Sequence, residues 1–221
     1  MRARWPADRR CARAIAVAVS VALGLAMASQ GAAADEPPRR SAYPGFSVLA
    51  PPGPDWVRVR SDSRSLVWMR RQRDPAHSFS VAVLTGPVPE GLDAPKDFET
   101  WVRTNKSASP DPERFVVRSV SVTRAEGHQK ACLAYRTQAE DRSGGASSLL
   151  VVAGLACRHP DAPGRYFDVQ HAERRPANLA ADSPEEEGEA FVEGFRFEAA
   201  PADRNWRIAP ERAVDPAREA S

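Results

Sequence analysis

The sequence is poor in the residues and motifs on which most enzyme and metal-site assignments depend. Its 221 residues include only 4 histidines and 3 cysteines. It contains no Gly-x-Ser-x-Gly motif, so the nucleophile turn of the α/β-hydrolases is absent. Its cysteines also lack the close paired spacing, such as Cys-x-x-Cys, that is usual in zinc sites. The sequence therefore gives little support to a serine hydrolase or to a zinc protein.

A long apolar run is present only near the N-terminus. Arginines at positions 2, 4, 9, 10 and 13 precede an apolar segment, residues 14–28, that is shorter than the roughly 20 residues needed to cross a bilayer. Residues 32–34, all alanine, then offer a small-x-small cleavage site. We therefore expect residues 1–34 to be a cleavable secretory signal peptide and the mature chain to be periplasmic or secreted, with an uncleaved anchor helix as the alternative. No later segment is long and apolar enough to span a membrane.

The positive balance of the sequence comes from this predicted signal. The whole chain has a formal net charge of +2. Without the five arginines and the one acid, Asp8, of residues 1–34, the formal net charge becomes −2. A basic balance that disappears with a targeting segment is no argument for nucleic-acid binding. The remaining 187 residues are enough for one domain with a substantial core.

Apolar and polar residues alternate in short segments that recur about every ten residues. Residues that favour turns separate these segments. Such a pattern is typical of an antiparallel β-meander, because side chains alternate between the two faces of a strand. The predicted strands are 46–50, 56–60, 65–70, 77–85, 115–123, 130–138, 149–157 and 165–172.

Two further segments show the features of helices. The predicted helices are 95–106 and 184–193. Pro95 and Pro184 suit the first helical position. Ser183 and Glu186 form a capping box, and the glutamates at 185–187 complement the positive end of the second helix as a solvated helix start.

Together these elements predict a mixed fold, α/β (α+β), in which one antiparallel sheet of about seven or eight strands is sandwiched by helices. We expect a single domain at residues 43–198. A proline-rich, flexible leader is predicted at residues 35–42, and a mobile C-terminal tail is predicted at residues 199–221.

The order of the elements and several aromatic residues resemble a known family. The residues that carry the resemblance are Phe46-Ser47-Val48, Pro51-Pro52-Gly53, Trp56, Phe98, Tyr166-Phe167, Phe191 and Phe195-Arg196-Phe197. They make the chain similar to the PsbP-like superfamily, named for an extrinsic subunit of the plant oxygen-evolving complex, over about residues 43–198. The resemblance implies an antiparallel sheet sandwiched between helices and a non-catalytic accessory or binding role. It transfers no functional residue to this chain, and photosynthetic partners do not follow from it.

A group of arginines is the clearest candidate binding feature. Six of them fall within sixteen residues, namely Arg58, Arg60, Arg64, Arg70, Arg71 and Arg73. If segments 56–60 and 65–70 form a hairpin, several of these side chains share one surface. Because arginine binds carboxylates and phosphates in a bidentate manner, the partner would be an anionic envelope component or an acidic protein. The alternative is a solvated sheet edge whose charges prevent aggregation.

The cysteines predict a disulfide. A two-residue turn at Gly144-Gly145 would place Cys132 directly opposite Cys157, in a non-hydrogen-bonded pair with Cα atoms about 4.5 Å apart. That separation suits a disulfide. Three alternatives remain open: two buried free thiols, a Cys157 nucleophile beside His159, and a metal set of Cys157, His159, Cys132 and His171.

These observations favour an exported, non-enzymatic binding or accessory module of the cell envelope. We predict no cofactor, no metal and no nucleic-acid partner. One alternative is a secretion-system adaptor or chaperone-like protein, which rests on the family resemblance alone. The other is a metal-binding or enzymatic protein that uses the cysteines and histidines.

Overall fold

The structure is a computed structural model, and it describes eight stretches of the chain. These are residues 40–52, 55–71, 77–92, 94–109, 111–126, 131–143, 148–178 and 184–200. The predicted signal peptide, residues 35–39 of the leader, the two turn glycines, Ser183, Arg73 and the tail from residue 201 lie outside these ranges. Among the described residues, no helix is both long enough and apolar enough to cross a membrane.

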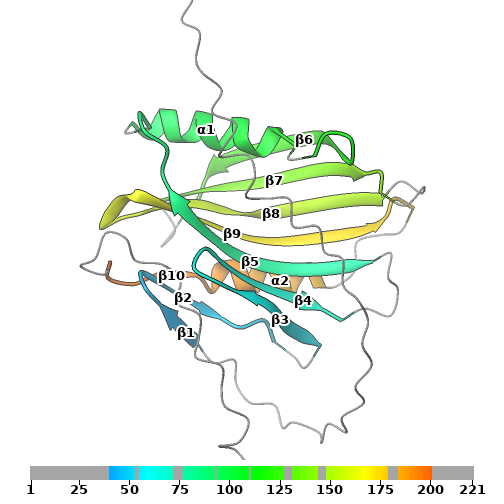
Figure 1. Ribbon diagram of the computed structural model, residues 1–221, viewed down its shortest axis with the longest axis horizontal. Coiled ribbons are helices and arrows are strands. Elements are labelled where there is room, and N and C mark those ends of the chain that lie inside the picture. Colours follow the sequence, from blue (N-terminus) through cyan, green and yellow to red (C-terminus); the bar gives the residue numbers. More distant parts are fainter. Residues whose placement is uncertain are drawn as a thin grey trace, which may run out of the picture.

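About half of the described chain forms one large antiparallel sheet (Figure 1). Its seven strands have the spatial order β3-β4-β5-β9-β8-β7-β6, and each neighbouring pair is antiparallel. The strand bounds are β3 Trp56–Ser61, β4 Ser65–Arg70, β5 Ser78–Pro87, β6 Phe115–Arg124, β7 Cys132–Asp141, β8 Ser148–His159 and β9 Ala162–Pro176. Each matches a strand predicted from the sequence, although β8 and β9 extend beyond their predicted bounds at both ends.

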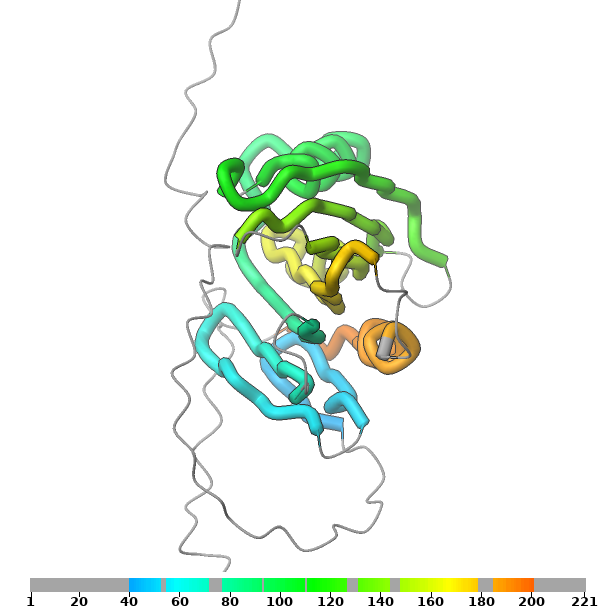
Figure 2. Tube along the Cα trace, turned by 90° about the vertical axis from the view of Figure 1, so that its right-hand side faces the viewer, coloured from blue at the N-terminus to red at the C-terminus, as the bar shows by residue number. Residues whose placement is uncertain are grey.

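The two helices lie where the sequence predicts them and cover opposite faces of the sheet. Helix α1 (Pro95–Ser107) packs over β6 and β7, and α2 (Pro184–Glu193) packs over β9, β5 and β8 (Figure 2). Phe98 of α1 belongs to one core cluster and Phe191 of α2 to the other. Neighbouring residues of β8 divide between them, since Leu155 joins the α2 cluster and Ala156 joins the α1 cluster. The domain is thus a mostly β, mixed fold with its sheet between two helices.

A second, small sheet corrects the predicted start of the domain. Its strands β1 (Arg40–Tyr43), β2 (Phe46–Leu49) and β10 (Arg196–Phe197) have the order β1-β2-β10. The last three residues of the predicted flexible leader, 40–42, therefore lie in a strand, because they pair with β2. A four-residue strand without strong alternation gives no signal that distinguishes it from a polar leader.

His159 joins this small sheet to the large one. Its ring is fully buried, and Nε2–H donates to the carbonyl oxygens of Gly45 at 3.1 Å and Glu198 at 3.0 Å. Nδ1 accepts the backbone N–H of Asp161 at 3.1 Å. Since one nitrogen donates and the other accepts, the ring is the neutral tautomer protonated on Nε2. Both nitrogens have backbone partners, so His159 holds the fold together at this point.

The predicted disulfide between Cys132 and Cys157 is present. The two residues pair directly across β7 and β8, their Cα atoms are 4.0 Å apart, and both are buried. The same register continues without a break to Asp141 opposite Ser148, although the turn itself lies outside the described residues. In this state neither sulfur is a thiolate. Within the described ranges, no group of three or more histidine, cysteine, aspartate or glutamate side chains is placed to hold a metal ion.

Candidate functional site

The arginine-rich segment forms the hairpin β3–β4 at one edge of the large sheet. Trp56 lies opposite Arg70, and Arg58 lies opposite Trp68. Side chains of directly opposed residues leave the same face of a sheet, and Trp68 belongs to the core cluster under α2. Four side chains of alternating kind, which we call the Trp–Arg block, therefore face the α2 side. They are Trp56, Arg58, Trp68 and Arg70.

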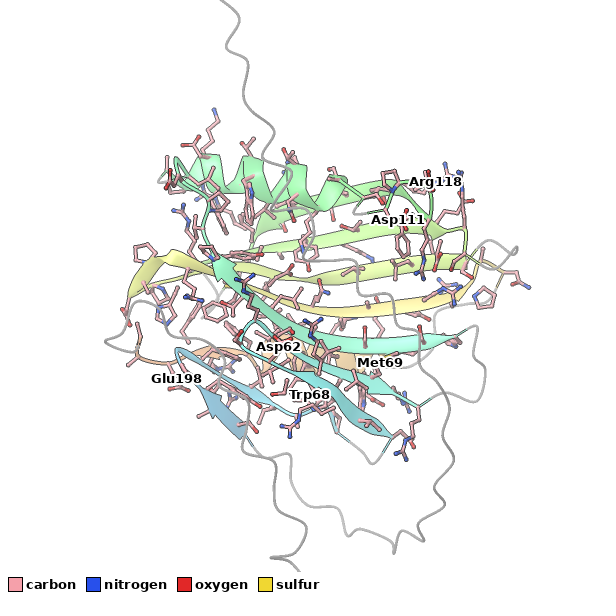
Figure 3. The ribbon with its side chains drawn as sticks, in the orientation of Figure 1. Asp62, Trp68, Met69, Asp111, Arg118 and Glu198 are labelled. Carbon is pink, nitrogen blue, oxygen red and sulfur yellow. A yellow bond between two sulfur atoms is a disulfide. The ribbon has the colours of Figure 1, made fainter. Side chains whose placement is uncertain are left out.

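Helix α2 packs directly against this block. The ring of Trp68 meets the ring of Phe191 edge to face, with centroids 5.6 Å apart. Figure 3 labels Trp68 on β4, in the lower part of the large sheet, and Asp62 at the turn of the hairpin. The block is therefore half core and half surface, since its tryptophans contact the helix while Arg58 is exposed.

A β-bulge changes the predicted arrangement of β3. Alternation predicts that Val57 and Val59 share one face and that Arg58 and Arg60 share the other. Instead the register shifts between Arg58 and Arg60, whose partners on β4 are the consecutive residues Trp68 and Val67. The two arginines therefore leave opposite faces of the sheet. Val59, the extra residue, is 53% exposed and is the one large apolar side chain that is exposed among the described residues.

The bulge also means that the predicted arginines do not form one surface. Arg60 pairs with Asp62 at 2.5 Å, and Arg70 is bound to α2. Arg64 is exposed at the turn, and Arg71 is exposed just after β4, where its backbone N–H donates to the carbonyl of Asp55 at 2.9 Å. Of the exposed arginines, Arg64 and Arg71 thus lie at the two ends of the hairpin and Arg58 lies near its middle.

Glu187 of α2 binds into the Trp–Arg block. Trp56 Nε1–H donates to Glu187 Oε2 at 2.7 Å, and Arg70 lies 3.4 Å from Glu187 Oε1. The Arg70 and Glu187 side chains are 25% and 29% exposed. The sequence offered no signal for this contact, because residues 131 positions apart meet only after the sheet has formed.

The start of α2 is also held from the other side. Arg136 of β7 donates to Glu185 at 2.8 Å, and this hydrogen bond lowers the pKa of Glu185 below its ordinary value. The expectation of a simply solvated acidic helix start is therefore wrong for Glu185 and Glu187. It holds for Glu186, which is exposed.

Between these two contacts, α2 lies directly on a buried histidine. A Cβ atom at Gly188 would lie 2.6 Å from the His171 ring, so only glycine permits this close approach. His171 is 7% exposed, and burial lowers its pKa below the ordinary value; Glu185 opposes this shift and Arg136 adds to it.

Replacing His171 by Asn should make the stability of the protein depend less on pH below neutrality. Because the pKa of His171 is lower in the folded than in the unfolded chain, the folded protein binds fewer protons once the pH falls below about 6.5. The wild type should therefore lose stability between pH 7.5 and 5.5, and His171→Asn should lose less. Melting temperature measured against pH tests this. Parallel curves for the two proteins would contradict a neutral buried imidazole.

A second polar cluster lies on the opposite face, under the end of α1. Tyr135 donates to Asp168 at 2.6 Å, and Lys106 of α1 contacts the same carboxylate at 2.5 Å and lies over the tyrosine ring. The tyrosine oxygen is also 2.8 Å from the amide of Gln170. The atom of Gln170 at this distance is Oε1, so Asp168 and Gln170 are alternative acceptors of the single phenolic proton. Burial raises the pKa of Tyr135 well above its ordinary value, which keeps the donor protonated.

This cluster has a structural role. Tyr135 lies opposite Gly154, so its ring extends across β8 to reach β9. A Cβ at Gly154 would lie 2.1 Å from a backbone oxygen of β9, which explains the glycine. Sequence alternation marked Tyr135 as part of a strand but gave no indication of its partners.

The surface candidate for function is therefore the β3–β4 hairpin, with its Trp–Arg block, its bulged Val59 and its exposed arginines. The disulfide, His159 and the Tyr135 cluster are all engaged within the fold. In comparisons with known proteins, no family model and no curated protein matches the chain.

Proposed function

We propose that the protein is an exported, non-enzymatic binding module of the cell envelope whose β3–β4 hairpin binds an acidic protein partner. The observation that carries this proposal is the bulge in β3, which turns Val59 out to 53% exposure directly beside the exposed Arg58. Bulges re-aim side chains and recur at functional edges. An exposed apolar side chain flanked by guanidinium groups suits a surface that presents carboxylates around an apolar residue.

The same geometry favours one mode of binding. Strand β3 lies at the edge of the sheet, where a partner strand could add to it. The bulge between Arg58 and Arg60 interrupts the regular backbone ladder along that edge and so disfavours strand addition. We therefore infer that the partner binds through side-chain contacts to the hairpin.

Export and family membership are parts of the same proposal. The buried disulfide is compatible with an oxidising compartment outside the cytoplasm, and the basic and apolar start of the sequence supports a cleavable signal peptide. The PsbP-like resemblance, and with it an accessory role, rests on the order of elements and the aromatic residues read from the sequence.

Reversing the charge of three exposed hairpin arginines should weaken binding strongly without unfolding the protein. The variant combines Arg58→Glu, Arg64→Glu and Arg71→Glu, three exposed side chains, and it leaves unchanged Arg60, which pairs with Asp62 beside the turn, and Arg70, which binds α2. The probe is a fluorescent peptide of alternating Glu and Leu, and the expected loss of affinity is roughly tenfold or more. Binding to the wild type should also weaken as salt screens the exposed charges.

The control changes the same number of charges elsewhere. It combines Arg103→Glu, Arg118→Glu and Arg124→Glu, which are exposed residues of α1 and β6. Figure 3 labels Arg118 near β6, across the sheet from the hairpin. This control should bind the peptide as the wild type does. Equal losses in the two triple variants, or binding that survives both reversal and high salt, would overturn the proposal.

A further inference from the structure

We infer that Trp56 and Arg70 form a carboxylate-binding site that Glu187 occupies as an internal ligand, so that α2 competes with the acidic partner for part of the docking surface. This inference rests on the proposed function and specifies how the same surface is regulated. Two donors from neighbouring strands converge on one carboxylate, since Trp56 Nε1–H binds Glu187 Oε2 at 2.7 Å and Arg70 lies 3.4 Å from Oε1.

The contact with Arg70 leaves room for a better ligand. Charge-assisted N–H to carboxylate hydrogen bonds are usually about 2.7–2.9 Å long, and arginine binds a freely approaching carboxylate with two parallel bonds. Glu187 Oε1 lies 3.4 Å from Arg70 Nη1, which is longer than this range. Because the helix fixes the backbone of Glu187, its side chain can approach Arg70 from few directions, whereas a carboxylate on a separate partner can approach freely.

The site is open to solvent and adjoins the exposed part of the hairpin. The side chains of Arg70 and Glu187 are about one quarter exposed, at 25% and 29%. Arg58 is the diagonal neighbour of Arg70 across β3 and β4, a relation that places such residues about 7–8 Å apart. One partner can therefore contact Arg58 and, once Glu187 has left, Arg70.

Release of Glu187 does not require release of the helix. Helix α2 stays attached through Phe191, which is 1% exposed and packs on Trp68, and through Glu185, which binds Arg136 at 2.8 Å. Exchange is thus a rotation of one side chain. An internal competitor that fills the site nine-tenths of the time lowers the apparent affinity about tenfold, because apparent affinity scales with the fraction of open sites.

Glu187→Ala is therefore expected to bind the Glu–Leu peptide about tenfold more tightly than the wild type. Glu186→Ala is the matched control, because it removes the same charge from the same helix at an exposed position. The control should change the affinity by less than about twofold, because it alters only a long-range charge interaction with the peptide, which salt screens. Adding Arg70→Gln to Glu187→Ala should remove the gain.

A second measurement follows the site directly. The indole N–H resonance of Trp56, assigned with Trp56→Phe, should shift when the peptide is added to Glu187→Ala. If Glu187→Ala folds poorly, Glu187→Gln keeps an acceptor for Trp56 and removes the charge, and it should bind with intermediate affinity.

The possible outcomes separate the two proposals. If the hairpin arginines are needed for binding but Glu187→Ala and Glu186→Ala bind equally well, the internal-ligand inference is wrong and the proposed function stands. If Glu187→Ala binds more weakly than the wild type, Glu187 supports the site instead of competing for it, and the inference is again wrong. If neither the wild type nor Glu187→Ala binds the peptide, both proposals fail.

Discussion

Asp141→Asn should lower the melting temperature by about 6–12 °C. Asp141 is fully buried at the end of β7, where Arg114 binds both of its oxygens at 3.1 Å and Arg174 binds Oδ2 at 2.7 Å. Removing one member of such a buried ion pair costs about 3 kcal/mol at the lower end of the usual range. The lower end applies because both arginines keep some contact with water. For a domain of this size, 1 kcal/mol corresponds to about 2–4 °C.

The effect of Asp141 should depend on pH. Burial by itself raises the pKa of this carboxyl, but hydrogen bonds from Arg114, the Ser143 N–H and Arg174 outweigh burial and hold the pKa well below its usual range. The group is therefore more acidic in the folded than in the unfolded chain, and its stabilising contribution is present above about pH 4 and is lost as the pH falls further. The difference in melting temperature between wild type and Asp141→Asn should shrink from neutral pH towards pH 2.

Glu140→Gln is the natural control for this measurement. Glu140 is the neighbouring acid and also pairs with two arginines, Arg118 and Arg142, but all three side chains are partly or largely exposed. Exposed ion pairs contribute little to stability, so the melting temperature should barely change. If the melting temperature falls no more in Asp141→Asn than in Glu140→Gln, the burial of Asp141 adds nothing to the stability of its ion pairs.

Loss of the disulfide should have an effect of similar size. The double variant Cys132→Ala and Cys157→Ala removes a bond that closes a sequence separation of 25. In the chain-entropy account, such a bond stabilises by about 3 kcal/mol, because it restricts the unfolded chain. The expected fall in melting temperature is on the order of 10 °C. Any pairing of these two strands that persists in the unfolded chain would lower this value.

Two measurements check the disulfide. Calorimetry compares the double variant with the wild type before and after reduction, and the reduced wild type should approach the variant. Thiol labelling of denatured, unreduced protein should leave Cys132 and Cys157 unmodified. Labelling of both residues would refute the bond, and an unchanged melting temperature on its removal would refute its stabilising role.

The sequence predicted the elements of the fold well because their signals are local. Alternation depends on residues two apart, and a helix start depends on a proline and on the few residues that cap the first turn. The prediction failed where structure depends on distant partners. Residues 40–42 form a strand only because β2 lies beside them, and Glu187 is bound only because β3 and β4 reach α2.

The two hairpins show most clearly what the sequence determined and what only the tertiary structure decided. Between β7 and β8 no residue is inserted, so counting outward from the predicted turn placed Cys132 opposite Cys157 correctly. Between β3 and β4 one residue is inserted, so the same counting assigned Arg58 and Arg60 to one face when they leave opposite faces. A bulge changes no local pattern, since its stability comes from the strand beside it and the core beneath it. The sequence therefore identified the candidate arginines, but only the packing of the strands determined which of them share a surface.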